Sequence, residues 1–468
     1  MGAQCIDWPG LSARIALIDD ALHASGIGQG ATVAVLGRND LPSAVAILTL
    51  VATGRCAAIV NPFRSGEAVL DSARRTSAAA MILAEDEPTL RCAEGSDTIL
   101  VLSDDGSFRG DARIAGRGTL LRGPHDGIMI STSGTTGVPK SHHIPLTTLS
   151  RALVEIEAFN AGFGDRRKGD GQWPSLIQYS SLSHIAGALT LLRGAAQGRQ
   201  TIVMRKFDAE VWASIVEEWQ PYTTGLPPSM MRMVLEADIA SERLSSLVSV
   251  WSGSAPVRAE DREGFTARYG LPVLGNYGAT EFCGAIAAWS LDDYREFGRT
   301  RSMAVGRIDR RNTEVRVIGA DGTPCTGFDH AGVLEFRLAR IGNQWIRTSD
   351  IGSIDRDDFL TLHGRKDDAI LRGGFKLSPG IIADMIRSHP LVRDVAVVGL
   401  PDSRLGEVPV AALELHESAA LSQEEVRDYV RSRLPAYFVP AKVRTVAALP
   451  RNAAMKLDRR AIVELFED

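Results

Sequence analysis

The sequence has few cysteines, and none is arranged to bind a metal or to build a disulfide framework. The five cysteines are scattered, odd in number and form no C-x-x-C pair. A zinc knuckle and a secreted disulfide scaffold are therefore excluded, and a reducing compartment is expected. We interpret all five as small buried apolar residues. They are Cys5, Cys56, Cys92, Cys283 and Cys325.

Long apolar runs and targeting signals are also absent. The longest apolar stretch, residues 44–52, is too short to cross a bilayer. The first ten residues show neither the basic nor the apolar part of a secretory signal. We therefore expect a cytoplasmic protein without stable membrane association.

Neither sign of charge is in large excess. The 468 residues include 52 Lys and Arg against 57 Asp and Glu, a net charge of −5. This balance argues against a nucleic-acid partner and against a basic membrane-surface protein. With 44% hydrophobic and 23% charged residues the chain has a globular composition, and it is long enough for more than one domain.

Short β-branched runs alternate with helical patterns in the first part of the chain. We expect strands over residues 31–37 and 56–62 and a buried helix over residues 41–53 between them. Such alternation indicates βαβ units, a mainly parallel sheet and an α/β fold. Residues 307–362 instead show short strands between turns, which indicates a small antiparallel or barrel-like region. An αβ pattern returns after the polar segment at 364–368.

The strongest local signal is STSGTTGVPK at residues 131–140, between an expected strand and an expected helix over residues 146–159. Glycines let backbone N–H groups converge, hydroxyls donate further hydrogen bonds and a lysine adds charge, so the segment is suited to polyphosphate. It is not a Walker A loop, because Pro139 stands where that motif needs glycine. A solvated turn is the competing interpretation. The candidate phosphate-binding residues are Ser131, Thr132, Ser133, Gly134, Thr135, Thr136 and Lys140.

This segment resembles the phosphate loop of the adenylate-forming superfamily, which includes acyl- and aryl-CoA ligases, peptide-synthetase adenylation domains and firefly luciferase. Further segments resemble motifs of that superfamily in the same order and cover nearly the whole chain. They are WSGSAPV at 251–257, NYGATE at 276–281, RTSDIG at 347–352, GRKDDAILRGGFKLSP at 364–379, HPLVRDVAVVGLPDSRLGE at 389–407 and LPRNAAMKLDRR at 449–460.

The resemblance implies a fold of two domains. Residues 1–366 would form a large N-terminal domain with the acyl and ATP sites, built from two αβ sheet subdomains and a small β-barrel-like subdomain. Residues 367–468 would form a smaller, mobile α+β C-terminal domain. A monomer or a homodimer is implied.

The resemblance also assigns the nucleotide site. Glu281, beside Thr280, would hold Mg²⁺ against phosphate oxygens; a glutamate at a helix N-terminus is the alternative. Asp350 and Arg365 would bind the ribose hydroxyls. The alternatives are that Asp350 is an aspartate of a turn and that Arg365 is a surface arginine. The adenine side would be formed by Gly253, Ser254, Ala255, Asn276, Tyr277 and Gly278. For Tyr277, burial in a core strand is the competing interpretation.

The resemblance makes Lys456 the catalytic lysine, which neutralises charge as the substrate carboxylate attacks the α-phosphate. Asp367 corresponds to a hinge. Rotation of residues 368–468 about it would replace Lys456 by the loop around Gly373 and Gly374 for thioester formation. The sequence departs from the usual motifs at several positions without losing a charged catalytic group: Ser141, Ser349, Gly380 and Met455.

SSLSHIAG at residues 180–187 resembles the H-x-x-G motif of acyl- and aryl-CoA ligases. No acidic residue occurs between Gln172 and Arg193, which disfavours an α-amino acid substrate. His184 would gate the carboxylate channel; a buried structural histidine is the alternative. Small residues with one aromatic indicate a broad apolar acid. The expected pocket residues are His184, Ala186, Gly187, Trp251, Gly275, Gly278 and Cys283.

We therefore expect an AMP-forming carboxylate–CoA ligase that uses ATP, Mg²⁺ and CoA. It would convert an aryl, alicyclic or medium-chain acid to acyl-AMP and pyrophosphate, then pass the acyl group to the CoA thiol. A free-standing carrier protein as acceptor is the first alternative. The second is an inactive nucleotide-binding homologue, which the joint presence of five charged residues argues against: Lys140, Glu281, Asp350, Arg365 and Lys456.

Overall fold

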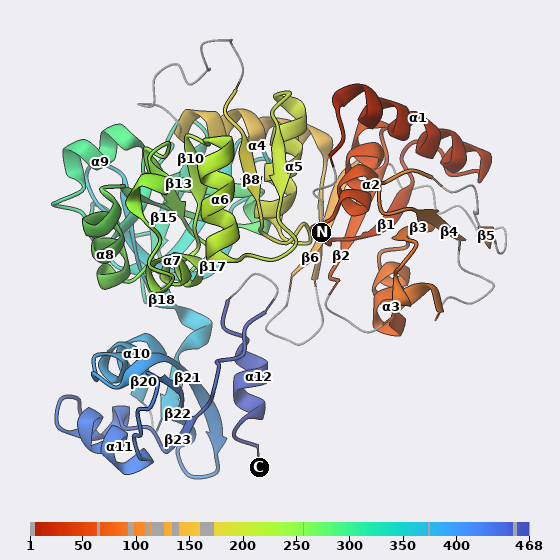
Figure 1. Cartoon of the computed structure of the whole chain (residues 1–468). Coiled ribbons are helices and arrows are strands. Elements are labelled where there is room, and N and C mark those ends of the chain that lie inside the picture. The colour runs from red at the N-terminus through yellow and green to blue at the C-terminus, as the bar shows by residue number, and fades with distance from the viewer. Residues whose placement is uncertain are drawn as a thin grey trace. The chain divides into compact units, whose positions relative to one another are not determined.

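The chain is seen in a computed structural model (Figure 1). It describes residues 5–62, 66–91, 98–108, 113–114, 126–132, 140–159, 173–255, 257–372, 375–452 and 456–467. By their internal contacts, the residues form two compact units. The first comprises Met1–Asn312 and Leu338–Gly342, and the second comprises Thr313–Arg337 and Asn343–Asp468.

The first unit begins with α1 (Trp8–Ala24) and contains a seven-stranded sheet in the order β5-β4-β3-β1-β2-β6-β7. The central pairs are parallel, as expected for βαβ units, whereas β5 and β7 add antiparallel edges. The strands are β1 (Thr32–Leu36), β2 (Cys56–Val60), β3 (Ala80–Ala84), β4 (Thr98–Leu102), β5 (Arg113–Ile114), β6 (Gly127–Thr132) and β7 (Lys140–Ile144).

The predicted strand–helix–strand unit at the start of this sheet is confirmed. Strands β1 and β2 are buried at every position. In a parallel sheet, helices cover both faces, so a continuous run of apolar residues buries its side chains on each face. Helix α2 (Leu41–Ala52) lies between them in the chain, and the Asp40 side chain accepts a hydrogen bond from the Ser43 N–H at 3.0 Å to cap it. The ends differ from the predicted ones by one or two residues.

The rest of the first unit contains a parallel pair, β8 (Leu176–Gln178) and β9 (Thr201–Val203), and the strands β10 to β14 in that order. Their bounds are β10 (Thr223–Gly225), β11 (Ser249–Ser252), β12 (Val273–Ala279), β13 (Gly284–Ala288) and β14 (Ala304–Ile308). The helices are α3 (Gly66–Arg75), η1 (Pro88–Arg91), α4 (Leu146–Phe159), α5 (Ile185–Ala196), α6 (Ala209–Trp219), α7 (Pro228–Glu236), η2 (Ser241–Leu244), α8 (Ala259–Tyr269), η3 (Thr280–Phe282) and α9 (Leu291–Phe297).

The second unit begins with the strands expected for the region after residue 307. Strands β16 to β18 pair antiparallel, which confirms the antiparallel pattern predicted there. The strands are β15 (Thr313–Ile318), β16 (Gly332–Leu338), β17 (Ile346–Ile354) and β18 (Phe359–Arg365).

A second sheet of this unit combines β20, β19, β22 and β21 in that order, with β23 beside β22. Ser422 forms a capping box at the start of α11. The elements are η4 (Lys366–Asp368), β19 (Ile370–Arg372), β20 (Phe375–Leu377), α10 (Pro379–Arg387), β21 (Val392–Asp402), β22 (Gly406–Leu415), α11 (Gln423–Arg431), η5 (Ala436–Phe438), β23 (Lys442–Thr445) and α12 (Arg459–Glu464). No helix in the described part of the chain is both long and apolar enough to span a membrane.

The prediction that all the cysteines are buried is wrong for two of them. Cys5 is exposed in the segment before α1, and Cys325 is partly exposed in the segment between β15 and β16. Among the described residues, no neighbouring segment packs over either of these two side chains closely enough to bury it. Cys56 and Cys283 are buried, and loss of hydration raises the pKa of each thiol to about 12. Cys92 lies outside the described residues.

Candidate active site

The predicted phosphate segment joins β6 to its neighbour β7, the strand at one edge of the sheet. These strands pair antiparallel, with Thr132 opposite Lys140 and Ser131 opposite Ser141. The hydroxyl oxygens of Ser131 and Ser141 lie 3.1 Å apart and share a hydrogen bond. The segment therefore has a hairpin at its base. The side chains of Thr132 and Lys140 and the candidates Ser133, Gly134, Thr135 and Thr136 lie outside the described residues.

Glu281 lies beside this hairpin. The end of β12 leads directly into η3, which buries Thr280 and leaves the Glu281 side chain 43% exposed. A Glu281 carboxylate oxygen is 3.7 Å from Nε2 of His142 in strand β7. The fold thus brings the predicted magnesium ligand to the strand that leaves the phosphate segment. Nothing in the sequence pattern singled out His142.

The loop after β11 meets the Asn276 side chain. Strands β11 and β12 pair parallel, and a Cβ atom at Gly253 would overlap the Asn276 side-chain amide in its observed position. Ser254 and Ala255 are exposed next to it. The Tyr277 ring is buried, with its centroid 6.3 Å from that of Phe282.

His184 caps α5, and a buried asparagine holds the loop before it. Nδ1 of His184 accepts a hydrogen bond from the Ala186 N–H at 3.3 Å. Asn39, 8% exposed, donates from Nδ2 to the Tyr179 carbonyl at 2.8 Å and to a second carbonyl in the chain beyond β9. Its Oδ1 accepts from the Leu182 N–H at 3.1 Å. One side chain from the β1–α2 turn thus fixes the His184 loop, a role that sequence reasoning missed.

The predicted acid-pocket residues differ in exposure. Ala186 and Gly278 are exposed, and His184, Trp251 and Gly275 are half-buried. Gly187 and Cys283 are buried, and a Cβ atom at Gly187 would overlap the Ser181 carbonyl oxygen. Cys283 packs into the large apolar core of the first unit. These two residues therefore face packed protein.

In the second unit, Asp350 and Arg365 are cross-strand partners on β17 and β18. Nε of Arg365 lies 3.2 Å from Oδ1 of Asp350. The Ser349 hydroxyl accepts hydrogen bonds from Nε of Arg365 at 3.0 Å and from its Nη2. The serine that departs from the superfamily motif therefore orients the arginine next to the aspartate.

Lys456 closes a short hairpin in the second unit. Its N–H donates to the Asn452 side-chain oxygen at 3.1 Å, and its carbonyl accepts from the Asn452 N–H at 2.8 Å. Arg451 and Leu457 form an antiparallel bridge across the base. Both backbone groups of the predicted catalytic lysine, its N–H and its carbonyl, are therefore held by Asn452. Met455 lies outside the described residues.

The predicted hinge lies in η4. The Asp367 backbone belongs to this single turn, but its side chain is outside the described residues, as are Gly373 and Gly374. The next residue, Asp368, forms an ion pair with Arg459 at the first position of α12. The start of the helix after the lysine hairpin is thus attached to the turn after β18.

The described residues contain no group of three or more His, Cys, Asp or Glu side chains that could hold a metal ion. Magnesium in nucleotide sites needs less, because one or two carboxylates and the phosphates complete its oxygen shell. The exposed Glu281 carboxylate fits that requirement.

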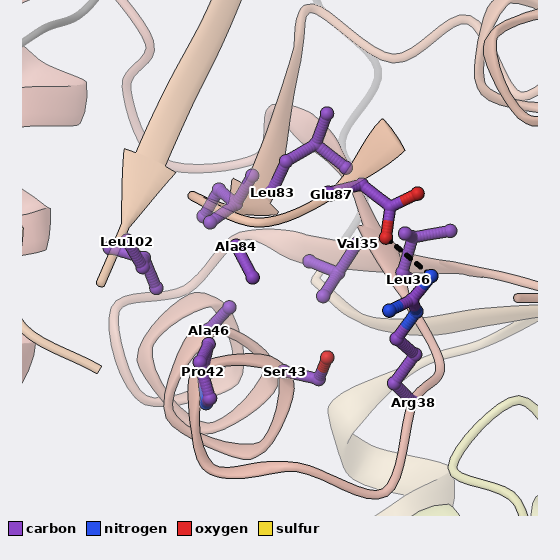
Figure 2. A pocket seen from close by; sticks show the side chains of 11 residues that line it. Val35, Leu36, Arg38, Pro42, Ser43, Ala46, Leu83, Ala84, Glu87 and Leu102 are labelled. Atoms are coloured by element: carbon purple, nitrogen blue, oxygen red, sulfur yellow. Dashed lines mark ion pairs between the residues drawn. The ribbon is translucent and has the colours of Figure 1, made fainter. Parts of the chain in front are cut away.

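A small pocket between β1, α2 and β3 is a packing feature. Figure 2 shows apolar side chains around it and an ion pair at one side, in which Nη2 of Arg38 lies 2.6 Å from the buried Glu87 carboxylate. Its volume of about 10 Å³ holds at most one water molecule. No substrate fits there.

The fold and these motifs define a two-domain enzyme that binds a nucleotide. The sequence profile described as AMP-binding enzyme matches residues 6–339, and the profile described as AMP-binding enzyme C-terminal domain matches residues 382–456. The chain therefore belongs to the AMP-binding enzyme family. The predicted membership of the adenylate-forming superfamily is confirmed, as is its α/β fold with a large N-terminal and a smaller C-terminal domain.

Several named proteins are similar to this chain over almost their full length. 4-Coumarate–CoA ligase-like 5 of Oryza sativa subsp. japonica is 26% identical, with 98% of this chain and 85% of that protein covered. A 2-succinylbenzoate–CoA ligase of Bacillus cereus is also 26% identical, with 98% of this chain and 93% of that protein covered. The ATP-bound structure of MatB from Rhodopseudomonas palustris has a TM-score of 0.81 at 21% identity and covers 99% of this chain and 94% of that one. This last likeness shows the fold.

Proposed function

We propose that the protein is an AMP-forming carboxylate–CoA ligase, active in the cytoplasm as a monomer or homodimer. The observation that carries the proposal is the 3.7 Å approach of the Glu281 carboxylate to His142 on β7. It joins a carboxylate suited to Mg²⁺ to the hairpin whose loop is suited to phosphate. The curated relatives named as CoA ligases support the same activity.

In the first step the chain binds ATP and a carboxylate. The Ser131–Lys140 segment would hold the phosphates, Asp350 and Arg365 the ribose, and Asn276 the adenine edge. Magnesium, when bound at Glu281, supplies positive charge to the phosphates. A carboxylate oxygen attacks the α-phosphorus, the bond to pyrophosphate breaks, and Lys456 neutralises the charge that develops.

In the second step the CoA thiol attacks the acyl carbonyl. The new C–S bond replaces the acyl–phosphate bond, AMP leaves and the thiol proton is released. We propose that rotation about Asp367 exchanges Lys456 for the loop at Gly373 and Gly374 between the steps. His184, at the start of α5, would gate the carboxylate channel.

We propose an apolar acid as the substrate, aryl before alicyclic or medium-chain. The lack of an acidic residue between Gln172 and Arg193 disfavours an ammonium-bearing acid. One of the named relatives, the 2-succinylbenzoate–CoA ligase of Bacillus cereus, supports the aryl choice.

The test is pyrophosphate release across a panel of carboxylic acids with MgATP, each with and without CoA. Sustained release with one aryl acid and CoA, together with a thioester product, is expected. Release that stops after one turnover despite CoA would instead favour a carrier-protein acceptor. ATP binding without release for any acid would contradict the ligase and favour an inactive homologue.

A further inference from the structure

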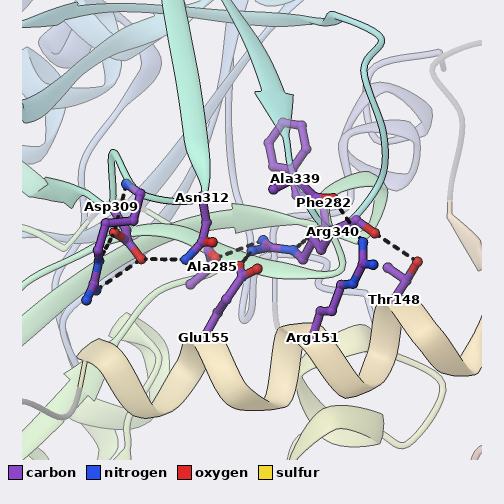
Figure 3. Close-up of polar contacts among 10 residues, drawn as sticks. Thr148, Arg151, Glu155, Phe282, Ala285, Asp309, Asn312, Ala339 and Arg340 are labelled. Atoms are coloured by element: carbon purple, nitrogen blue, oxygen red, sulfur yellow. Dashed lines mark hydrogen bonds and ion pairs between the residues drawn. The ribbon is translucent and has the colours of Figure 1, made fainter.

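The turn that follows β16 is fastened to α4. Within this turn, the Arg340 carbonyl accepts from the Thr148 hydroxyl at 3.1 Å, and the Ala339 carbonyl accepts from Nη1 of Arg151 at 3.2 Å (Figure 3). Thr148, Arg151 and Glu155 lie on one face of α4, three and four residues apart. The turn, which belongs to the first unit, therefore has a fixed position on this helix.

From this turn the Arg340 side chain enters the interior of the first unit. It is 4% exposed, and it forms an ion pair with the Glu155 carboxylate. Its Nε donates to the Phe282 carbonyl at 2.8 Å, and its Nη2 donates to the Ala285 carbonyl at 3.0 Å. A buried guanidinium is tolerated because its charge is paired and its N–H groups have acceptors. Figure 3 shows these contacts converging on one side chain.

The two carbonyls flank a kink in the backbone. Cys283 and Gly284, between them, have φ values of 54° and 112°, and Cys283 is a non-glycine residue in the left-handed region. Phe282 is the last residue of η3 and directly follows Glu281. The planar guanidinium thus bridges the kink and fixes the turn from which the Glu281 side chain projects.

We propose that Arg340 is a positioning residue for Glu281, the magnesium ligand of the proposed function on which this inference rests. The Glu281 side chain is 43% exposed and its carboxylate lies 3.7 Å from Nε2 of His142, so its position depends on that contact and on the backbone from which it projects. Arg340 holds that backbone through the Phe282 carbonyl. Lysine would keep the charge opposite Glu155 but cannot donate to two carbonyls in this fixed geometry.

The test is calorimetric titration of Arg340→Lys with ATP, once with Mg²⁺ and once with EDTA. We expect MgATP affinity to fall about tenfold, the range for partners that orient metal ligands, while affinity for metal-free ATP changes less than about twofold. Glu155→Gln keeps a hydrogen-bond acceptor for Arg340, so we expect a smaller loss of MgATP affinity, again with little change in the affinity for metal-free ATP. Arg151→Lys alters the same turn without touching η3 and should change neither affinity.

Two results would overturn the inference. Arg340→Lys could bind MgATP as tightly as the wild type, or it could lose equal affinity with and without Mg²⁺, as general loosening of the first unit would cause. A wild type whose ATP affinity does not respond to Mg²⁺ would instead overturn the magnesium role of Glu281 in the proposed function.

Discussion

Nη2 of Arg451 lies 2.7 Å from a carboxylate oxygen of Asp394, at the base of the hairpin that contains Lys456. The Asp394 side chain is 4% exposed, and Arg387 approaches it from the other side at 3.6 Å. The lysine hairpin is therefore anchored to β21 by a largely buried ion pair.

Arg451→Gln should loosen this hairpin without removing its lysine. We expect pyrophosphate release to fall by about tenfold or more, because small misplacement of a catalytic group is costly. Unfolding of the second unit should become easier by about 1–3 kcal/mol, since a buried carboxylate loses a partner. Pyrophosphate release is measured at a temperature where the variant is folded, and the unfolding free energy is measured by denaturant titration at the same temperature. A variant that unfolds more easily but releases pyrophosphate at the wild-type rate would exclude the positioning role.

Lys456→Ala should separate the two half-reactions. We expect acyl-AMP formation to fall by about 10²–10³-fold, the cost of removing one group that stabilises transition-state charge. Thioester formation from supplied acyl-AMP should change little. Pyrophosphate release and CoA-ester formation are measured separately, and equal loss in both assays would contradict the assignment.

Asp367→Pro should restrict the proposed hinge in η4. Proline fixes φ, so the turn loses the freedom that a rotation requires. We expect pyrophosphate release to continue while thioester formation from acyl-AMP stops. An unaffected second step would mean that no rotation at this residue is needed.

Asn39→Asp should disturb the His184 loop while conserving side-chain size. The carboxylate replaces an N–H₂ group that donates to two carbonyls, so oxygen would face oxygen in a buried place. We expect destabilisation of about 1–3 kcal/mol and a raised KM for the acid, with the KM for ATP unchanged. Asp40→Asn, at the neighbouring helix cap, is the matched control. Equal changes in both KM values would argue against a specific effect on the acid site.

The buried thiols predict weaker stability in alkali. In the folded chain the pKa of Cys56 and of Cys283 is about 12, above the ordinary value of 9.0. Above pH 9 the unfolded chain releases these protons and the folded chain does not, so the unfolding free energy should fall as pH rises toward 12. Cys283→Ala should flatten that decline in denaturant titrations between pH 8.5 and 10.5, a range of about two units around the ordinary pKa. Cys5→Ala, at an exposed position, is the control.

Local patterns in the sequence predicted the elements well. The alternation before residue 62 predicted the parallel strands β1 and β2, because the periodicity of apolar residues is a local property of the sequence. The motif order also identified the family. The exposed Cys5 was not predicted, because exposure depends on which segment covers a residue.

The contacts between residues far apart in the chain could not be predicted from the sequence. Arg340 and Glu155 are 185 residues apart, and neither stands in a motif. Asn39 and His142 look like ordinary polar residues until the chain folds. Ser349 was noticed as a departure, but its hydrogen bonds to Arg365 depend on the β17–β18 register. Spacing along a chain does not encode which strands become neighbours.

The assignment of Leu338–Gly342 to the first unit has a consequence for synthesis on the ribosome. Domains tend to fold as they emerge, N-terminal part first. Here residues 1–312 emerge without Arg340, so Glu155 and the kink after η3 lack that partner until the turn after β16 is made. The first unit therefore cannot finish folding while only its continuous segment has been translated, and a chain truncated at residue 312 should be prone to aggregation.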